Sequence, residues 1–354
     1  MITKPRVLFI LKRRHDYNPI EHDKINLTTG LYNSVNFMNK MLIRENIETK
    51  IVVVEDNNCI DREVTEYKPT HVIIEALWVV PTKFSALQKL HPDVSWIVRL
   101  HSDTPFIAGE GIAMDWIGEY SGYRNVIVAC NSPKILQEIR TYLRIRNKWP
   151  EKHTEEKVIY LPNYYPNFYK KKEHNFEKDY INVGCFGAVR PLKNHLLQAM
   201  AAIKFADAVG KKLHFHVNSG RYEMKGEPVF NNLKALFEQL ASSGHELIIH
   251  GWMPREEFLQ ICAEMDIGLQ VSLSETFNIV SADLISQGVP VVGSAEIPWM
   301  TNWTHADPVK SQDIALKLQA TFDHPQINVW LNQRGLTKYT NETKLIWSRY
   351  FKKN

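Results

Sequence analysis

Residues 266–292 read DIGLQVSLSETFNIVSADLISQGVPVV, and the succession of patterns in this stretch decides the fold. Residues 266–271, with Ile267, Leu269 and Val271, predict a strand, a polar loop follows it, and residues 279–287 predict a helix. Gly288 then leads into a second short apolar run at 290–292, which predicts another strand. Strand, helix and strand in this order indicate a βαβ unit, in which parallel strands are covered by helices.

The same alternation runs along the whole chain. Further strands are predicted at residues 7–11, 49–54, 71–77, 96–100, 126–129 and 158–161, and again at 181–186, 213–217 and 246–250. Helices are predicted by apolar residues at helical spacing (Leu31, Val35, Met38, Leu42), by Ser132 before Pro133, and over residues 193–207, 229–242, 255–265 and 341–351. The expected fold class is α/β, with two doubly wound, Rossmann-like domains facing a central cleft.

The length of the chain also favours two domains. At roughly 150 residues per domain, 354 residues give about two. The turn-rich stretch 162–167 and the charged stretch 170–174 interrupt the alternation, so we expect a solvated linker there. We therefore expect domains at residues 1–168 and 169–335, and a terminal segment, 336–354, whose helix packs back on the first domain.

Composition excludes several classes of protein. Hydrophobic residues make up 44% and charged residues 23%, which is ordinary for a globular chain and excludes a disordered one. The four cysteines are far apart in the sequence, which excludes a disulfide scaffold and a clustered zinc site. No apolar stretch approaches the ~20 residues of a membrane span. We expect a soluble, cytoplasmic protein without a transmembrane segment.

Polar residues that directly follow strands are the candidate site residues, because ligands of doubly wound sheets bind beyond the carboxyl ends of the strands. Glu275 lies in the loop after strand 266–271, and Asp283 follows eight residues later, about two turns into the helix. The helix start near Asn278 offers unpaired N–H groups, which suit a phosphate or sugar oxygen. From spacing alone, the two acids fit equally well a pair of sugar-binding carboxylates, or a loop cap and a solvated acid.

The junction after strand 181–186 carries two cations. Gly187 allows a tight turn, and Arg190 and Lys193 follow before the next helix. A guanidinium fork and an ammonium at such a junction would neutralise a diphosphate, and solvated loop charges are the alternative interpretation. His101 ends a strand of the first half, where it is either a structural histidine or a site residue facing the cleft. The absence of a G-x-G-x-x-G motif counts against a nicotinamide dehydrogenase.

At these positions the chain resembles family 4 of the retaining glycosyltransferases, which have the GT-B fold. The E-x7-E region of that family, S-x-x-E-G-F-G followed by E-A-x-x-x-G-x-P-V-V, is matched in register by Glu275, Phe277, Gly288, Pro290, Val291 and Val292. Lys193 falls six residues after Gly187, as the family's G-R-x-x-x-x-K phosphate motif requires. His101 occupies the place of the family's histidine beside the transferred sugar.

The resemblance implies a hexosyltransferase that uses a UDP- or GDP-sugar as co-substrate and needs no cofactor. The sequence contains no D-x-D motif, so we expect cationic side chains rather than a metal on the diphosphate. The implied catalytic residues are His101, Glu275, Arg190 and Lys193. The implied residues of the sugar-donor site are Gly30, Gly187, Arg190, Lys193, Trp252, Met253, Glu275, Thr276, Phe277, Asn278, Ile279 and Asp283.

The chain also departs from the family pattern. Its second acid is Asp283 instead of Glu, and Thr276 and Asn278 replace two loop glycines. Ala188 stands where the phosphate motif has arginine, so Arg190 is proposed only as a substitute. These departures leave the ribose contact and the choice of sugar open.

The acceptor is expected to be anionic. Residues up to Asn175 include 25 basic and 21 acidic side chains, against 18 of each afterwards, so the whole net charge of +4 lies in the first half. Residues 12–15 are one basic cluster, and Arg140, Arg144 and Lys148 share one helical face, which is either solvated or phosphate-binding. A modified base in viral DNA is one candidate acceptor, and a lipid-linked or surface glycan at an anionic membrane is the alternative.

Two other classes of protein stay open. A non-catalytic module would bind a nucleotide sugar or a nucleic acid without turning it over. A sugar-nucleotide epimerase shares this fold, but it needs acids and bases clustered at the sugar, and His101 with Glu275 are too few.

Overall fold

The computed structural model describes residues 4–13 and 30–353 of the chain. The chain forms two compact units. Unit 1 consists of Met1–Pro166 and Thr340–Asn354, and unit 2 consists of Asn167–Tyr339. The domain boundaries predicted from the sequence lie after residues 168 and 335, a few residues from those of the structure.

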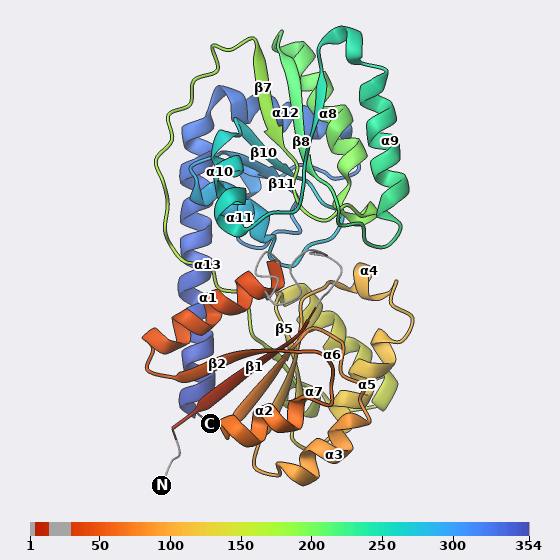
Figure 1. The fold of residues 1–354 in the computed structure, drawn as a ribbon, viewed down its shortest axis with the longest axis vertical. Coiled ribbons are helices and arrows are strands. Elements are labelled where there is room, and N and C mark those ends of the chain that lie inside the picture. The colour runs from red at the N-terminus through yellow and green to blue at the C-terminus, as the bar shows by residue number, and fades with distance from the viewer. Residues whose placement is uncertain (1–3, 14–29, 354) are drawn as a thin grey trace. The chain divides into compact units, whose positions relative to one another are not determined.

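Unit 1 contains a six-stranded parallel sheet in the order β2-β1-β3-β4-β5-β6 (Figure 1). Its strands are β1 (Arg6–Lys12), β2 (Glu48–Val54), β3 (His71–Glu75), β4 (Ser95–Leu100), β5 (Val126–Cys130) and β6 (Val158–Tyr160). Its helices are α1 (Gly30–Arg44), α2 (Ile60–Tyr67), α3 (Lys83–Leu90), α4 (Thr104–Ile107), α5 (Ala113–Gly122), α6 (Pro133–Asn147) and α7 (Glu151–Lys157).

The alternation of side chains along the strands explains why helices cover both faces of this sheet. In β1, Leu8 and Ile10 pack into a core that includes residues of α2, α3, α5 and α6. Val7 and Phe9 point to the opposite face and pack with α1 and with Trp347 from the C-terminal segment. Both faces are buried, and β1 is accordingly an unbroken apolar run rather than an alternating one.

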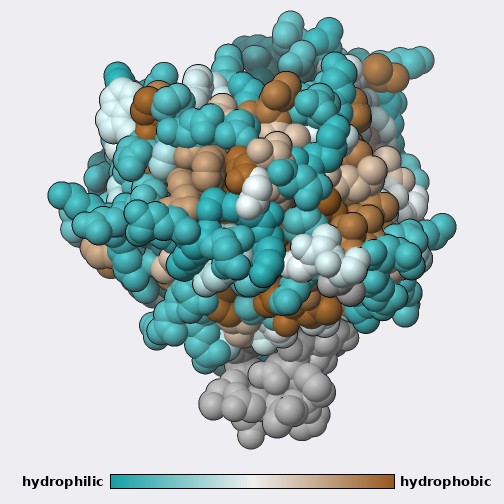
Figure 2. Space-filling view, turned by 90° about the horizontal axis from the view of Figure 1, so that it is seen from above, coloured by the Kyte–Doolittle hydropathy of each residue, from teal (hydrophilic) through white to brown (hydrophobic). Residues whose placement is uncertain are grey.

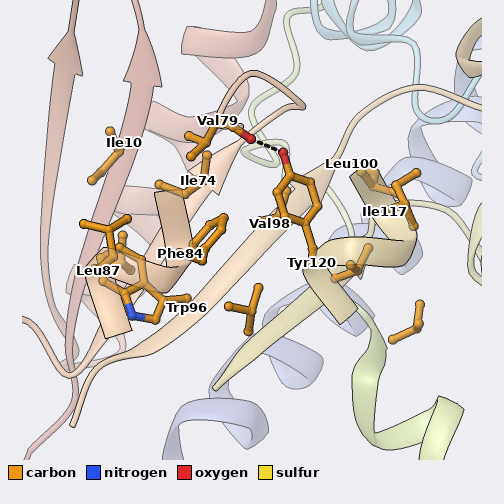
Figure 3. Close-up of a cluster of buried hydrophobic side chains, with 14 of the residues drawn as sticks. Ile10, Ile74, Val79, Phe84, Leu87, Trp96, Val98, Leu100, Ile117 and Tyr120 are labelled. Carbon is orange, nitrogen blue, oxygen red and sulfur yellow. Dashed lines mark hydrogen bonds between the residues drawn. The ribbon is translucent and has the colours of Figure 1, made fainter. Parts of the chain in front are cut away.

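Aromatic side chains fill the centre of the first of these cores (Figure 3). Phe84 of α3 lies edge-on to Trp96 of β4, with ring centroids 5.8 Å apart, and to Tyr120 of α5, at 5.5 Å. The Tyr120 hydroxyl donates a hydrogen bond to the carbonyl of Val79, which satisfies the one polar atom of that ring. The aromatic cluster thus fixes α3 and α5 to the same face of the sheet.

Unit 2 contains a five-stranded parallel sheet in the order β11-β10-β7-β8-β9 (Figure 1). Its strands are β7 (Tyr180–Gly184), β8 (Lys212–Asn218), β9 (Glu246–His250), β10 (Ile267–Gln270) and β11 (Val291–Gly293). Its helices are α8 (His195–Ala208), α9 (Gly226–Glu238), α10 (Arg255–Glu264), α11 (Ile279–Ser286), α12 (Ser311–Asp323) and the first part of α13 (Pro325–Lys353), together with the short 3-10 helices η1 (Pro191–Lys193), η2 (Ala241–Ser243) and η3 (Asn302–Thr304).

The structure confirms the fold class and every predicted strand. The helix after Asn131 also begins as predicted, with Pro133 in its first position and the Ser132 hydroxyl accepting a hydrogen bond from the Ile135 N–H at 3.3 Å. Several short helices are not predicted by the sequence. In α7, for example, the sequence EKHTEEK buries only Thr154, so no apolar periodicity marks it. The four cysteines are free thiols, and three of them are buried.

The prediction that residues 170–174 are solvated is wrong for Lys172. Its ammonium donates hydrogen bonds to the carbonyls of Ala263, at 2.6 Å, and Met265, at 2.5 Å, at the C-terminal end of α10. Burial lowers the pKa of Lys172. Lys170 also donates its backbone N–H to the carbonyl of Ser286 at 2.7 Å. This part of the linker is therefore fixed to unit 2.

The strand orders define where ligands are expected. In unit 2 the chain runs from the central β7 to β8 and β9, and then returns to β10 on the other side of β7. The connections that follow β7 and β10 therefore lead toward opposite edges of the sheet, and such a switch point opens a crevice at the carboxyl ends of the strands. The corresponding switch point in unit 1 lies between β1 and β3.

Among the described residues, no helix combines the length and the apolar composition needed to cross a bilayer. The face shown in Figure 2 is mainly hydrophilic, and its hydrophobic residues lie in separate patches. Such scattered apolar residues are ordinary on a protein surface.

Buried asparagines of α13 cover the outer edge of the unit 2 sheet. The Asn328 side chain accepts a hydrogen bond from the Val291 N–H, at 2.8 Å, and donates one to the Val291 carbonyl, at 3.0 Å. Asn332 donates to the Asn328 side-chain oxygen at 3.0 Å. Both asparagines are fully buried. The Asn328 amide therefore satisfies the backbone of the edge strand β11 much as a neighbouring strand would.

We predict that Asn328→Ala lowers the free energy of unfolding of unit 2 by about 1–3 kcal/mol, because it leaves the buried N–H of Val291 without its hydrogen-bond acceptor. Urea denaturation measures the effect. Gln326→Ala, an exposed position on the same helix, is the control and should leave the midpoint unchanged. Equal midpoints for the two variants would contradict the role assigned to Asn328.

Candidate active site

The switch point of unit 2 brings a lysine and a glutamate together. Lys193 ends η1 after β7, and Glu275 lies in the loop after β10. The Lys193 ammonium donates a hydrogen bond to the Glu275 carboxylate, and the two side chains are only 11% and 7% exposed. The two loops are also joined by the backbone, since the Leu273 N–H donates to the Leu192 carbonyl at 2.8 Å. A cation and an anion therefore meet, largely removed from water, where a ligand is expected.

The backbone before Lys193 explains its position. Gly187 has φ +117°, a conformation that L side chains rarely adopt, and its N–H donates to the Asn218 side chain at 3.0 Å. A Cβ placed on Gly187 would lie 3.9 Å from the Cε of Lys193, so the lysine stem runs close to this glycine. Asn194 then turns the chain into α8 with φ 61°, and its amide donates to the Val271 carbonyl at 3.2 Å.

Asn278 begins α11 at a position where the resembling family has glycine. Its φ is 56°, in the left-handed region that asparagine tolerates better than most residues. Its side chain accepts a hydrogen bond from the Ser281 N–H at 2.9 Å and donates one to the Gln270 side chain at 3.1 Å. Ile279 is the first helical residue. Asparagine thus preserves the turn and adds a helix cap.

Thr276 and Phe277 are both buried. The Phe277 ring packs against Trp299, with centroids 6.2 Å apart, and against Tyr339, at 5.5 Å. Its carbonyl accepts a hydrogen bond from the Trp299 indole at 2.7 Å. Phe277 therefore shapes the loop from inside, and its ring does not line a ligand surface.

Arg190 belongs to a three-residue charge cluster. It pairs with Glu223 at 2.9 Å, and Arg221 pairs with the same carboxylate at 2.6 Å. Burial disfavours the charged carboxylate, but the two guanidinium groups outweigh burial and lower the pKa of Glu223. The Arg221 guanidinium also lies 5.2 Å from the ring centroid of Trp252. The two guanidinium groups therefore share one carboxylate beside the strand ends.

The second acid of the candidate motif is also paired. The buried Asp283 carboxylate lies 2.6 Å from the guanidinium of Arg255, the first residue of α10. Met253, two residues before Arg255, is half-buried. The carboxylate expected at a ribose is therefore neutralised by a neighbouring cation.

Two stacked histidines lie at the ends of β8 and β9. The Nδ1 of His216 is 2.9 Å from the Nε2 of His250, and their ring centroids are 5.2 Å apart. Burial, together with the smaller effects of the nearby His250 and His214, lowers the pKa of His216 to about 3. Both rings are therefore neutral near pH 7, and one nitrogen of the pair carries a proton that the other accepts.

In unit 1, His101 follows β4 and contacts a fully buried ion pair. The His101 Nε2 lies within hydrogen-bond distance of the Glu75 carboxylate, and Glu75 pairs with Arg99 at 3.2 Å. Of the remaining predicted residues, Gly30 is the first residue of α1. Residues 14–29, which precede it, lie outside the described residues.

The basic face of α6 is partly neutralised by α7. Arg140 donates to the Val158 carbonyl at 2.9 Å and lies 3.5 Å from Glu155. Arg144 lies 4.0 Å from Glu151. In the other basic cluster, at residues 12–15, Arg13 pairs with Glu55 at 2.6 Å, and residues 14 and 15 lie outside the described residues.

A separate pocket of about 510 Å³ lies in unit 1 at the amino ends of β4 and β5, the edge of the sheet opposite His101. Its lining includes Ser95, Trp149, His153 and Lys157. The Lys157 ammonium donates to backbone carbonyls, including that of Arg124 at 3.1 Å. This pocket is not part of the candidate site. In the described ranges, no group of three or more His, Cys, Asp and Glu side chains is placed to hold a metal ion.

The charged partners of the predicted site residues are not predicted from the sequence. Glu75 and Arg99 carry a readable signal, since each is a lone charge inside an otherwise apolar strand, and buried charges are usually paired. Glu223 and Arg255 carry no such signal. They lie in a loop and at a helix start, where charged residues are ordinary.

Two tandem units with parallel, Rossmann-like sheets define the GT-B fold of glycosyltransferases, and solved structures with that fold match the chain. One is a sucrose-phosphate synthase from Thermosynechococcus elongatus, with 12% identity, a TM-score of 0.69 and coverage of 98% of each chain. Another is the catalytic domain of Arabidopsis thaliana starch synthase IV bound to ADP and acarbose, with 10% identity, a TM-score of 0.68, and coverage of 99% of this chain and 100% of that one.

Anabaena HepE in complex with UDP also matches, with 14% identity, a TM-score of 0.61, and coverage of 96% of this chain and 95% of that one. No protein-family model and no curated protein sequence matches the chain. At these identities the likeness concerns the fold, which confirms the expected GT-B architecture without singling out family 4.

We predict that unit 2 loses stability as the pH falls from about 6.5 to about 3, because His216 stays neutral in the folded protein while it is protonated in the unfolded chain. One such histidine contributes about 1.4 kcal/mol per pH unit within this window. Urea unfolding at about pH 6.5 and about pH 5 measures the slope. The His216→Asn variant should show a smaller slope than the unmodified protein, and an unchanged slope would contradict the assignment.

Proposed function

We propose that the protein is a retaining glycosyltransferase, which moves a hexose from a nucleoside diphosphate sugar to an acceptor hydroxyl. The observation that carries this proposal is the buried Lys193–Glu275 pair at the switch point of unit 2. A ligand that is anionic at one end and carries hydroxyl groups at the other can replace the contact between the ammonium and the carboxylate. The ammonium then binds the anionic end, and the carboxylate binds the hydroxyl groups. A sugar diphosphate has this character.

The proposed roles follow from the chemistry of each group. The Lys193 ammonium binds the diphosphate and stabilises the negative charge that grows on it as the bond to the sugar breaks. Glu275 accepts hydrogen bonds from hydroxyl groups of the sugar. The N–H groups of Ile279 and Val280, which precede the Ser281 N–H that Asn278 caps, add donors for the same phosphate oxygens.

The proposed reaction is a front-face displacement. The bond between the anomeric carbon and the diphosphate oxygen breaks, and its electron pair leaves with the diphosphate. The acceptor oxygen bonds to the anomeric carbon on the same face, and its proton passes to the departing phosphate. His101 is proposed to act at the transferred sugar, as the resemblance to family 4 implies.

The charge clusters around the pair complete the proposed sugar-donor site. Arg190 contributes a guanidinium group that Glu223 holds in place, so it can attract an anion while paired. Asp283 would accept a hydrogen bond from a ribose hydroxyl group while it stays paired with Arg255. Trp252, with Arg221 against its ring, offers a flat surface for a base. Structures similar in fold contain UDP and ADP, so these nucleotides and their sugars are the first ligands to test.

We propose that the acceptor is a hydroxyl group of a sugar or a sugar phosphate. A modified base in DNA and a membrane-bound glycan are the less favoured alternatives. The similar structures include synthases named for sucrose phosphate and starch, which supports a carbohydrate acceptor. Carboxylates beside Arg140 and Arg144 weaken the case for a DNA-binding face on α6. An anionic acceptor still agrees with the charge excess of the first half.

We predict that Lys193→Ala lowers the turnover of the preferred nucleotide sugar by about 10²-fold or more, comparable to the loss of one preorganised hydrogen-bond donor. A panel of UDP-, ADP- and GDP-sugars, assayed for nucleotide release with and without sugar acceptors, identifies that substrate. Lys204→Ala, an exposed lysine on the adjoining α8, is the matched control. Near-normal turnover of Lys193→Ala would remove the proposed phosphate site.

The same panel separates the rival functions. Release of the nucleoside diphosphate supports a transferase, whereas conversion to an isomeric nucleotide sugar would indicate an epimerase. Binding without any chemical change would indicate a non-catalytic module.

We also predict that the transfer needs no divalent metal, because Lys193 supplies the positive charge at the diphosphate. Dialysis against EDTA should leave the rate of nucleotide release unchanged. A rate that falls with EDTA and returns with added manganese would contradict this prediction.

A further inference from the structure

We propose that β9 is a self-association strand. Two copies of the chain pair antiparallel through β9, about a two-fold axis at Ile248, and their two unit 2 sheets become one continuous sheet. The inference concerns an interaction surface, so it does not depend on the proposed catalytic activity. It follows from the position of β9 in the sheet, from its exposure and from the order of its five residues.

β9 lies at the border of the unit 2 sheet. It is the last strand in the order β11-β10-β7-β8-β9, and its neighbour in that sheet is β8. At the opposite border, Asn328 and Asn332 hydrogen-bond to the backbone of Val291 in β11. Within residues 4–13 and 30–353, no side chain hydrogen-bonds to the backbone of residues 247–249. One border of the sheet is therefore covered, and the other is open.

The hydrogen bonds to β8 decide which backbone groups of β9 point outward. In a strand, the N–H and C=O of one residue point to the same side, and successive residues alternate. The His250 carbonyl accepts a hydrogen bond from the Ser219 N–H at 2.8 Å, so the even-numbered residues of β9 face β8. The N–H and C=O groups of Leu247 and Ile249 therefore point away from the sheet, where a further strand can bind.

β9 is apolar in sequence but exposed. It reads ELIIH, and among the strands that the structure describes it is the one without a buried residue. Ile249 is 44% exposed. An exposed apolar border strand is a template for another chain, and proteins that avoid such pairing usually place lysine or proline there. β9 contains neither of them, so its sequence favours a partner strand.

The order of the residues fits a second copy of the same strand. In an antiparallel pair centred on Ile248, Leu247 of each copy lies opposite Ile249 of the other. All outward-pointing groups of the two strands then form hydrogen-bonded pairs. Glu246 lies opposite His250 of the second copy, so a carboxylate meets an imidazole and no like charges face each other. This is the one centre that pairs all five residues of both strands.

Pairing in this register also buries apolar surface. Leu247 packs against the core of unit 2, which includes Phe230 and Leu233 of α9. Ile249 lies on the same face of β9, because side chains alternate along a strand. In the pair, Ile249 of each copy lies beside Leu247 of the other and extends this core across the junction. The same patch thus serves both copies, as in the two-fold contacts of most soluble homo-oligomers.

The first test is the mass of the purified full chain, measured by sedimentation velocity over a range of concentrations. We expect a species of twice the mass of one chain, whose fraction rises with concentration. Ile249→Lys should raise the dissociation constant by about 10²-fold, because each substitution enters the two-fold interface twice. Leu316→Lys, at a position of α12 that is 58% exposed, is the matched control and should leave the dimer unchanged.

A second variant tests the backbone alone. Ile249→Pro removes an N–H that points outward and leaves the hydrogen bonds to β8 in place, since proline is tolerated at such positions of border strands. We expect it to weaken the dimer as well, with an unchanged circular dichroism spectrum. A single species with the mass of one chain at all concentrations would overturn the proposal. A dimer that persists in both Ile249 variants would overturn it too.

Hydrogen exchange locates the contact. We expect the amides of Leu247 and Ile249 to exchange rapidly in dilute solution, where the chain is monomeric, and to become protected in the dimer. The amides of Ile248 and His250 face β8 and should be protected at every concentration. Rapid exchange of Leu247 and Ile249 in a dimer would place the interface elsewhere and contradict the proposal. Protection of both amides in the monomer would show that the chain itself covers this border, which would also contradict it.

Discussion

The contact between the Lys193 ammonium and the Glu275 carboxylate is the interaction on which the proposed sugar-donor site depends. Two charges that are largely withheld from water are costly unless they are paired, and each holds the other in place. The pair forms because the parallel strands β7 and β10 are neighbours whose carboxyl ends meet at one edge of the sheet. Gly187 and Asn278 provide the backbone conformations that bring the two loops there. Sheet order and local turns thus create an electrostatic site together.

The same principle operates in unit 1. Neighbouring strands β3 and β4 place Glu75 opposite Arg99, and the imidazole of His101 completes the group at the strand end. In both units, a charged residue within an apolar strand or in a loop has its partner on an adjacent strand or on the loop that follows that strand. Charges of this kind are worth little for stability, so their positions point to ligand binding or to the orientation of a neighbour.

The sequence predicts the sheets well because buried parallel strands are apolar on both faces, and runs such as 7–11 and 126–129 cannot be mistaken for loops. It also places Lys193 and Glu275 just after strands, although it does not show that these two strands are neighbours. It does not predict that Arg255 neutralises Asp283, or that Glu223 joins two arginines, because those contacts depend on where loops and helix starts lie in space. Short polar helices such as α7 are missed because they bury too few apolar residues to show a period.

The amide of Asn328 has a consequence for the behaviour of the chain in a crowded solution. The last strand of a sheet presents unpaired backbone groups, which can template the addition of a strand from another molecule. Asn328, which belongs to α13 of the same chain, hydrogen-bonds to both the N–H and the carbonyl of Val291 and so covers part of the β11 edge. Self-association through this border is thereby discouraged by the side chains of Asn328 and Asn332 at Val291, together with the bridge between Gly293 and His305.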